Sequence, residues 1–202
     1  MIITSQAKYN LMAGFLEAFV LLLGIMDPLL SLAAFLTLTK NMDREERDKI
    51  AIKAVIVAAV VFFIFAIGGG PILGILGVQM DSFKAAGGIV LILLGIQMSL
   101  GITFPKEKDD MNEVAVVIGT PMITGPATIS AAIILGASDG VMTTVVAGSA
   151  ALLVTLLALV FARHLDKIFG TSGIRIMSTM MGIITMAWGL QFLLIGISSF
   201  KP

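Results

Sequence analysis

Cysteine is absent from this chain, which excludes disulfides, thiolate metal sites and a cysteine nucleophile. Charge is scarce, because only 13% of residues are charged and the 13 bases balance the 13 acids, so no basic footprint for nucleic acid exists. His164 is the only histidine, and Asp27 is the only acid deep in an apolar run. This supply of ionisable groups predicts neither an enzyme nor a metal or cofactor site.

Apolar residues predominate in the composition: 58% of the 202 residues are hydrophobic, and the mean hydropathy is +1.06. Such values lie outside the range of soluble domains and predict an all-α, multi-pass protein of the cell (inner or plasma) membrane. The first eleven residues are too polar for a signal-peptide core, so the first hydrophobic segment is expected to be retained. Six apolar runs with few charged residues are candidate transmembrane helices. These runs are Leu11–Leu38, Ile50–Ile67, Phe83–Phe104, Val114–Ala137, Val141–Ala162 and Ile174–Ile197.

The distribution of lysine and arginine predicts the orientation. With the N-terminus outside, Lys8, Lys84 and Lys201 are the only bases on the outer side, and the other ten fall inside. Both termini are therefore predicted to lie on the outer face. Four of the ten inner bases belong to TKNMDREERDK, whose mixed charges indicate a solvated turn and the start of a helix.

Glycine and proline punctuate the apolar runs unevenly. The stretch GGGPILGILGVQMD predicts that the second helix ends at 68–71. The apolar residues that follow are too few to cross a bilayer, so a re-entrant or interfacial piece is expected near 68–80.

An internal repeat relates the two halves of the chain. Gly88 and the triplet Gly95-Ile96-Gln97 recur as Gly182 and Gly189-Leu190-Gln191, and nearly the same shift places Asp27-Pro28 on Thr120-Pro121. Three spans per repeat is an odd number, so the halves enter the membrane in opposite directions, as in many secondary transporters. The predicted repeats are 1–104 and 114–202, joined by an inner linker at 105–113.

Helices one and four are predicted to be interrupted in mid-membrane. Asp27-Pro28 interrupts the first run, and Pro121, Gly125 and Pro126 fall within the fourth. Irregular backbone at this depth is tolerated only where it is buried in protein or lines a cavity. Half-helix ends there present free N–H and carbonyl groups, which together fit a small zwitterion. A proline kink without any ligand is the alternative.

Three roles are open for Asp27: contact with an ammonium or cation, carriage of a proton, or capping of the second half-helix through N–H groups at Leu30 or Ser31. Four further positions are candidates for lining the pathway. The glutamines have cross-helix hydrogen bonding as their alternative, and the glycines have close helix packing. These four are Gln97, Gln191, Gly88 and Gly182.

The segments DPLLSLAAF, FKAAGGIVLILLGIQM and TPMITGPATIS make the chain similar to the MarC family of inner-membrane proteins across nearly its whole length. The family is grouped with LysE-type exporters, and its archaeal branch includes transporters of glycine and alanine. The resemblance implies a transporter that holds a small neutral amino acid between the two interrupted helices. Leu30 and Ala33 depart from the family pattern, which has glycine and proline there. The substrate-binding residues predicted on this basis are Asp27, Pro28, Leu29, Leu30, Thr120, Pro121, Thr124, Gly125 and Pro126.

Other function classes are weighed against a carrier. A channel or passive facilitator for ions or small solutes is the main alternative, and a flux that never saturates would favour it. A membrane-embedded hydrolase lacks a cluster of catalytic side chains. A regulatory or structural subunit is a further alternative, but that role does not explain the two helix breaks. The sequence leaves open the direction of transport, coupling to a proton or sodium ion, and the oligomeric state.

Overall fold

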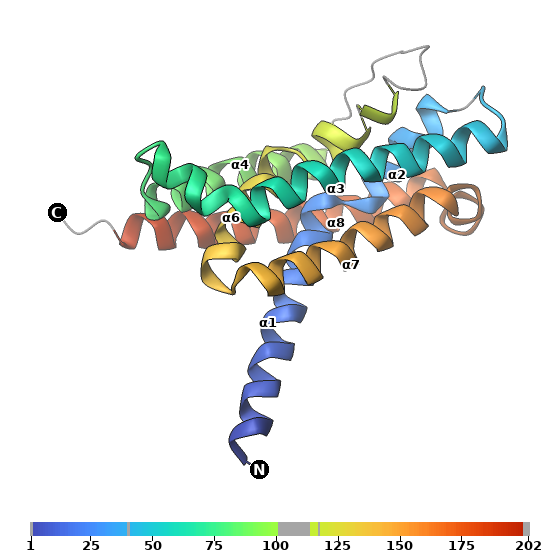
Figure 1. Cartoon of the computed structure of the whole chain (residues 1–202). Coiled ribbons are helices and arrows are strands. Elements are labelled where there is room, and N and C mark those ends of the chain that lie inside the picture. The colour runs from blue at the N-terminus through green and yellow to red at the C-terminus, as the bar shows by residue number, and fades with distance from the viewer. Residues whose placement is uncertain (1, 40, 101–113, 117, 200–202) are drawn as a thin grey trace.

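The computed structural model describes residues 2–39, 41–100, 114–116 and 118–199 of the chain, and within these it is helical without strands (Figure 1). Five helical stretches in this part of the chain are long and apolar enough to cross a membrane. The predicted all-α, multi-pass class is therefore confirmed at this level. The predicted linker 105–113 and the end of the third run lie outside the described residues. The five stretches are Gly14–Leu38, Arg44–Ile75, Met80–Leu100, Val141–Val160 and Ser172–Ser198.

Eight elements follow one another within the described residues. The first predicted run is α1 (Ile2–Met26) followed by α2 (Pro28–Leu38), and the second is α3 (Arg44–Ile75). The remaining elements are α4 (Met80–Leu100), η1 (Ile118–Ile123), α6 (Pro126–Ser138), α7 (Val141–Val160) and α8 (Ala162–Ser198). Figure 1 shows the first turns of α1 projecting from a bundle formed by the other helices.

The fourth predicted run is not one helix. It contains the short π-helical segment η1 and the 13-residue helix α6, which is shorter than a transmembrane helix needs to be. The last helix is also divided, because Gly170 has a left-handed φ of 64° and separates the apolar stretch from the turns that precede it. That stretch begins at Ser172, close to the predicted start at Ile174.

The start of α3 confirms the predicted solvated turn. Asp43 accepts a hydrogen bond from the Glu46 N–H at 2.8 Å, and the Glu46 carboxylate accepts one from the Asp43 N–H at 3.0 Å. This reciprocal capping box satisfies two of the N–H groups that a helix start leaves unpaired.

The predicted helix end at 68–71 is wrong, because α3 continues through Pro71 to Ile75. Gly69 lies against α6, where an added Cβ would collide with the side chain of Ile133, so close packing and not chain reversal explains this glycine. Pro71 is exposed and lies near the end of the helix, where few hydrogen bonds remain for it to disrupt. Gly74 and Ile75 at the end of α3 are exposed, whereas Leu73 is buried, and interfacial placement of 68–80 stays a prediction.

Helices α4 and α8 pack most closely, through glycines that face each other in pairs. A Cβ on Gly88 would lie 2.5 Å from the carbonyl oxygen of Gly189, and one on Gly182 would lie 2.8 Å from that of Gly95. The order of these contacts makes the two helices antiparallel. Only glycine permits this backbone approach, so small residues determine the packing of this pair.

Candidate functional site at two helix breaks

The first break lies at Asp27, between α1 and α2. Its backbone is left-handed, with φ 36° and ψ 78°, and it is the only non-glycine residue with positive φ in the described part of the chain. Aspartate tolerates this conformation better than most residues. Pro28 then occupies the first position of α2, where its fixed φ suits a helix start and its missing N–H costs nothing.

The Asp27 side chain is buried, with 3% of its surface exposed, and each of its oxygens accepts a hydrogen bond. Oδ1 accepts from the N–H groups of Leu29 and Leu30, both at 3.2 Å. Oδ2 accepts from the Ser178 hydroxyl of α8 at 2.5 Å. The Ser31 N–H donates to the Asp27 carbonyl oxygen at 3.0 Å instead of to the side chain. The capping role of Asp27 is confirmed, whereas substrate contact and proton carriage stay predictions.

Ser178 is a site residue that the sequence did not reveal. It is 4% exposed and is 151 residues from Asp27 in the chain. A lone hydroxyl in an apolar helix normally bonds to its own backbone, so nothing local marks it as the partner of an acid. The contact fixes the start of α2 against α8.

The second break extends from Thr120 to Gly125. Thr120 is extended, with φ −145° and ψ 117°, inside η1. Gly125 is extended as well and stands at the N-cap of α6, which begins at Pro126. Pro28 and Pro126 therefore correspond, because each is the first residue of the helix that follows its break. The repeat in the sequence instead paired Pro28 with Pro121, the earlier of the two prolines in the second break. Both half-helices have proline at the first position.

The starts of the two half-helices differ in their hydrogen bonding. Asp27 satisfies the first N–H groups of α2, whereas Gly125 brings no side chain to cap α6. The Thr120 hydroxyl does not serve as a cap, and it is one of two buried side-chain polar atoms without a partner in the described residues. The second break thus retains hydrogen-bonding capacity that the first has already used.

At each break, a hydroxyl group of the helix after the break donates a hydrogen bond to a carbonyl group at the end of the segment before it. Ser31 Oγ donates to the Met26 carbonyl oxygen at 3.4 Å, and Thr128 Oγ1 donates to that of Ile123 at 3.0 Å. In both cases the bond crosses the break. These hydroxyls reduce the cost of carbonyl groups buried without helical partners.

Thr124 fastens the second break to α3, because its buried hydroxyl donates to the Ala58 carbonyl oxygen at 3.0 Å. We expect Thr124→Val, which keeps the shape and removes the donor, to lower the free energy of unfolding by about 1 kcal/mol. Thr37→Val is the matched control, since the exposed Thr37 hydroxyl bonds only within its own helix, to Ala33. Unfolding in detergent micelles measures both. Equal stabilities of the two variants would contradict a tertiary role for Thr124.

The structure brings the two breaks into one packed region, because α1 and α2 both contact η1, and α1 also contacts α6. Pro28, Leu29 and Leu30 are half-buried, Gly125 is buried and Pro126 is exposed. Pro121 lies within η1, and its side chain is outside the described residues.

The four candidate pathway residues lie on α4 and α8. Gly88 and Gly182 are buried between the two helices. Gln97 is half-buried and Gln191 is exposed. Among the described residues, no three His, Asp or Glu side chains gather into a group that could hold a metal ion.

Comparison with known proteins gives a consistent result. Residues 12–200 match the family model described as "MarC family integral membrane protein". Similar curated proteins are named "UPF0056 membrane protein". One from Archaeoglobus fulgidus is 33% identical, covering 91% of this chain and 92% of its own length. One from Methanocaldococcus jannaschii is 34% identical, covering 91% and 95%, and one from Buchnera aphidicola is 30% identical, covering 92% of each chain. No solved structure matches the chain significantly.

Proposed function

The chain belongs to the MarC family of integral membrane proteins, and we propose that it is a secondary transporter of small neutral amino acids such as glycine and alanine. The observation that carries the proposal is the pair of breaks at Asp27 and at 120–125, which are packed together and lie among buried hydroxyl groups. Interrupted helices of this kind form substrate sites near the midplane of many transporters.

We further propose that the halves form an inverted repeat of three spans each, with η1 and α6 together providing the sixth span and both termini outside. The reciprocal contacts of α4 and α8 support this. In the predicted repeat, Gly88 is equivalent to Gly182 and Gly95 is equivalent to Gly189. Gly88 contacts Gly189 and Gly95 contacts Gly182, so exchanging the equivalent residues turns one contact into the other. A two-fold axis perpendicular to two antiparallel helices produces such a pattern. Alternating access would then be a movement of one half against the other.

The hydrogen bonds of the two breaks suggest how a zwitterion would be oriented. Its carboxylate is assigned to the start of α6, where no side chain caps the N–H groups and the Thr120 hydroxyl lacks a partner. The start of α2 is less suitable, because Asp27 already occupies its N–H groups. The ammonium is assigned to the carbonyl end of α1, on the Asp27 side of the site, where helix carbonyl groups carry partial negative charge. The uncharged side chain of glycine or alanine would require little space.

Counterflow in proteoliposomes tests the proposal. The protein is expected to exchange labelled glycine or alanine in a saturable manner, and excess unlabelled substrate should compete. Uptake under imposed proton or sodium gradients then identifies the coupling ion. Failure to exchange any small amino acid, in vesicles that contain folded protein, would refute the proposal. A flux that rises linearly with concentration would instead indicate a channel or facilitator.

A further inference from the structure

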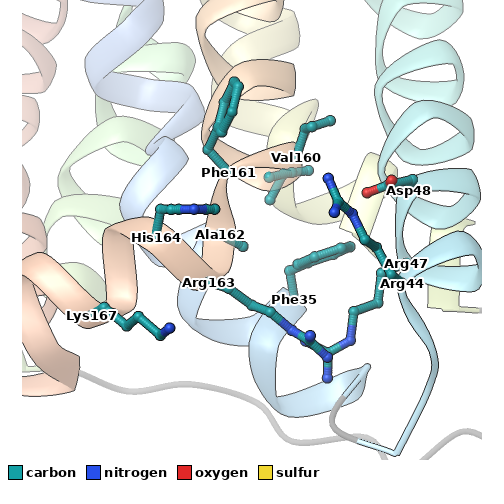
Figure 2. A pocket seen from close by; sticks show the side chains of 11 residues that line it. Phe35, Arg44, Arg47, Asp48, Val160, Phe161, Ala162, Arg163, His164 and Lys167 are labelled. Atoms are coloured by element: carbon teal, nitrogen blue, oxygen red, sulfur yellow. The ribbon is translucent and has the colours of Figure 1, made fainter.

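A cavity of about 270 Å³ opens at the end of the bundle where α3 begins (Figure 2). Figure 2 shows the side chains of Arg44 and Arg47 on one side of it and those of Arg163, His164 and Lys167 on the other. The first two belong to α3, and the others belong to the start of α8. Buried Phe35 of α2 provides an apolar wall. We call this cavity the basic pocket.

Positive charge exceeds negative charge among the described residues that line the basic pocket. Asp48 is the only acid among the described lining residues, against three arginines and one lysine. Arg47 of α3 and Arg163 of α8 line the same cavity, so these two helices bring like charges together. Within the described residues, Arg44, Arg163 and Lys167 form no ion pair. A bound anion would relieve this repulsion.

The lining suits a phosphate group. Guanidinium groups bind phosphate oxygens through paired N–H donors, and basic pockets between transmembrane helices receive lipid headgroups. Phe161 lines the same pocket and is 52% exposed, and nearby Ile168 is 72% exposed. Exposed apolar side chains beside the bases suit a ligand that carries acyl chains, and an aromatic ring is common at the headgroup level.

We propose that the basic pocket binds the phosphate group of an anionic ligand at the membrane surface. A phospholipid headgroup and free inorganic phosphate are the two sources of this group, and the apolar rim favours the lipid. This site is separate from the two helix breaks, so the proposal does not depend on the transported substrate.

Native mass spectrometry of the full-length protein in detergent tests the proposal. Phosphatidylglycerol is titrated against phosphatidylcholine with the same acyl chains, and the wild type is expected to retain the anionic lipid preferentially. Each arginine near a lipid headgroup contributes enough to change affinity about fivefold. Arg163→Gln should therefore weaken phosphatidylglycerol binding about fivefold, and Arg44→Gln with Arg163→Gln about 30-fold. Lys53→Gln is the matched control, because Lys53 is exposed on α3 and does not line the pocket.

A second arm measures thermal stability in inorganic phosphate and in chloride at equal ionic strength. Protection by phosphate that depends on Arg44 and Arg163, without selective lipid binding, would support the site and assign it to the free anion. If the double variant does not fold, Arg163→Gln alone still tests the proposal. Unchanged binding in folded pocket variants, or a loss as large in Lys53→Gln, would overturn the proposal. So would the absence of any preference for phosphatidylglycerol or phosphate in the wild type.

Discussion

Replacing Gly88 by alanine is expected to lower the free energy of unfolding by about 3 kcal/mol, at the upper end of the usual cost of overpacking. The added Cβ would lie 2.5 Å from the Gly189 carbonyl oxygen and 2.5 Å from the Leu193 nitrogen, and both are backbone atoms of α8. Backbone cannot move aside as the tip of a flexible side chain can. The two helices must therefore separate, which loses packing along the whole α4–α8 contact. Thermal unfolding in detergent, with the yield of monodisperse protein, measures the effect.

Gly74→Ala is the matched control, because no atom outside its own helix lies within 4 Å of the position that a Cβ would occupy. Alanine there should be neutral or stabilising by up to about 1 kcal/mol, since it favours the helix more than glycine does. Gly189→Ala should destabilise much as Gly88→Ala does, because its Cβ would lie 2.8 Å from the Gly88 carbonyl oxygen. A Gly88→Ala protein as stable as the control would disprove the close approach of α4 and α8.

The sequence predicted much of the fold because membrane helices leave strong local signals. Long apolar runs gave α7 and the last stretch of α8 nearly to the residue, and proline inside such runs located both breaks. The position of the second half-helix was less certain, since Pro121 and Pro126 are both local breakers. Only the backbone shows that α6 begins at Pro126, after an extended Gly125.

Contacts between distant segments were not predictable from the sequence. The glycines and proline at 68–71 predicted the end of α3, but the helix continues to Ile75. Gly69 is required there because α6 packs against it. Ser178 reaches Asp27 from another helix. The bases at the start of α3 indicated a solvated face, and their convergence with Arg163 and Lys167 depends on how α3 and α8 meet. Such pairings are tertiary, so neither periodicity nor composition encodes them visibly.

Asp27→Ala is the second substitution with a large expected effect, and we expect it to cost about 3 kcal/mol. Loss of a helix cap costs about 1 kcal/mol, and leaving the buried Ser178 hydroxyl without its acceptor adds about 2 kcal/mol. The residue would also keep a left-handed φ of 36°, which alanine adopts less readily than aspartate. Because Asp27 fixes the start of α2, amino-acid counterflow should be lost with it. Unfolding in detergent and counterflow in proteoliposomes measure the two effects.

Asp27→Asn separates capping from proton carriage. Its amide oxygen can accept the Leu29 and Leu30 N–H groups, and its amide nitrogen can donate to the Ser178 oxygen, so the break should be preserved at a cost of about 1 kcal/mol. Counterflow, which needs no ion gradient, should therefore survive in Asp27→Asn. Proton-driven accumulation should be lost if Asp27 carries the proton, and its retention would exclude that role. Ser178→Ala, which leaves the cap intact, is the control for damage to the α2–α8 contact. If Asp27→Asn abolished counterflow while unfolding like Ser178→Ala, capping alone would not explain Asp27, and its charge would have to contact the substrate.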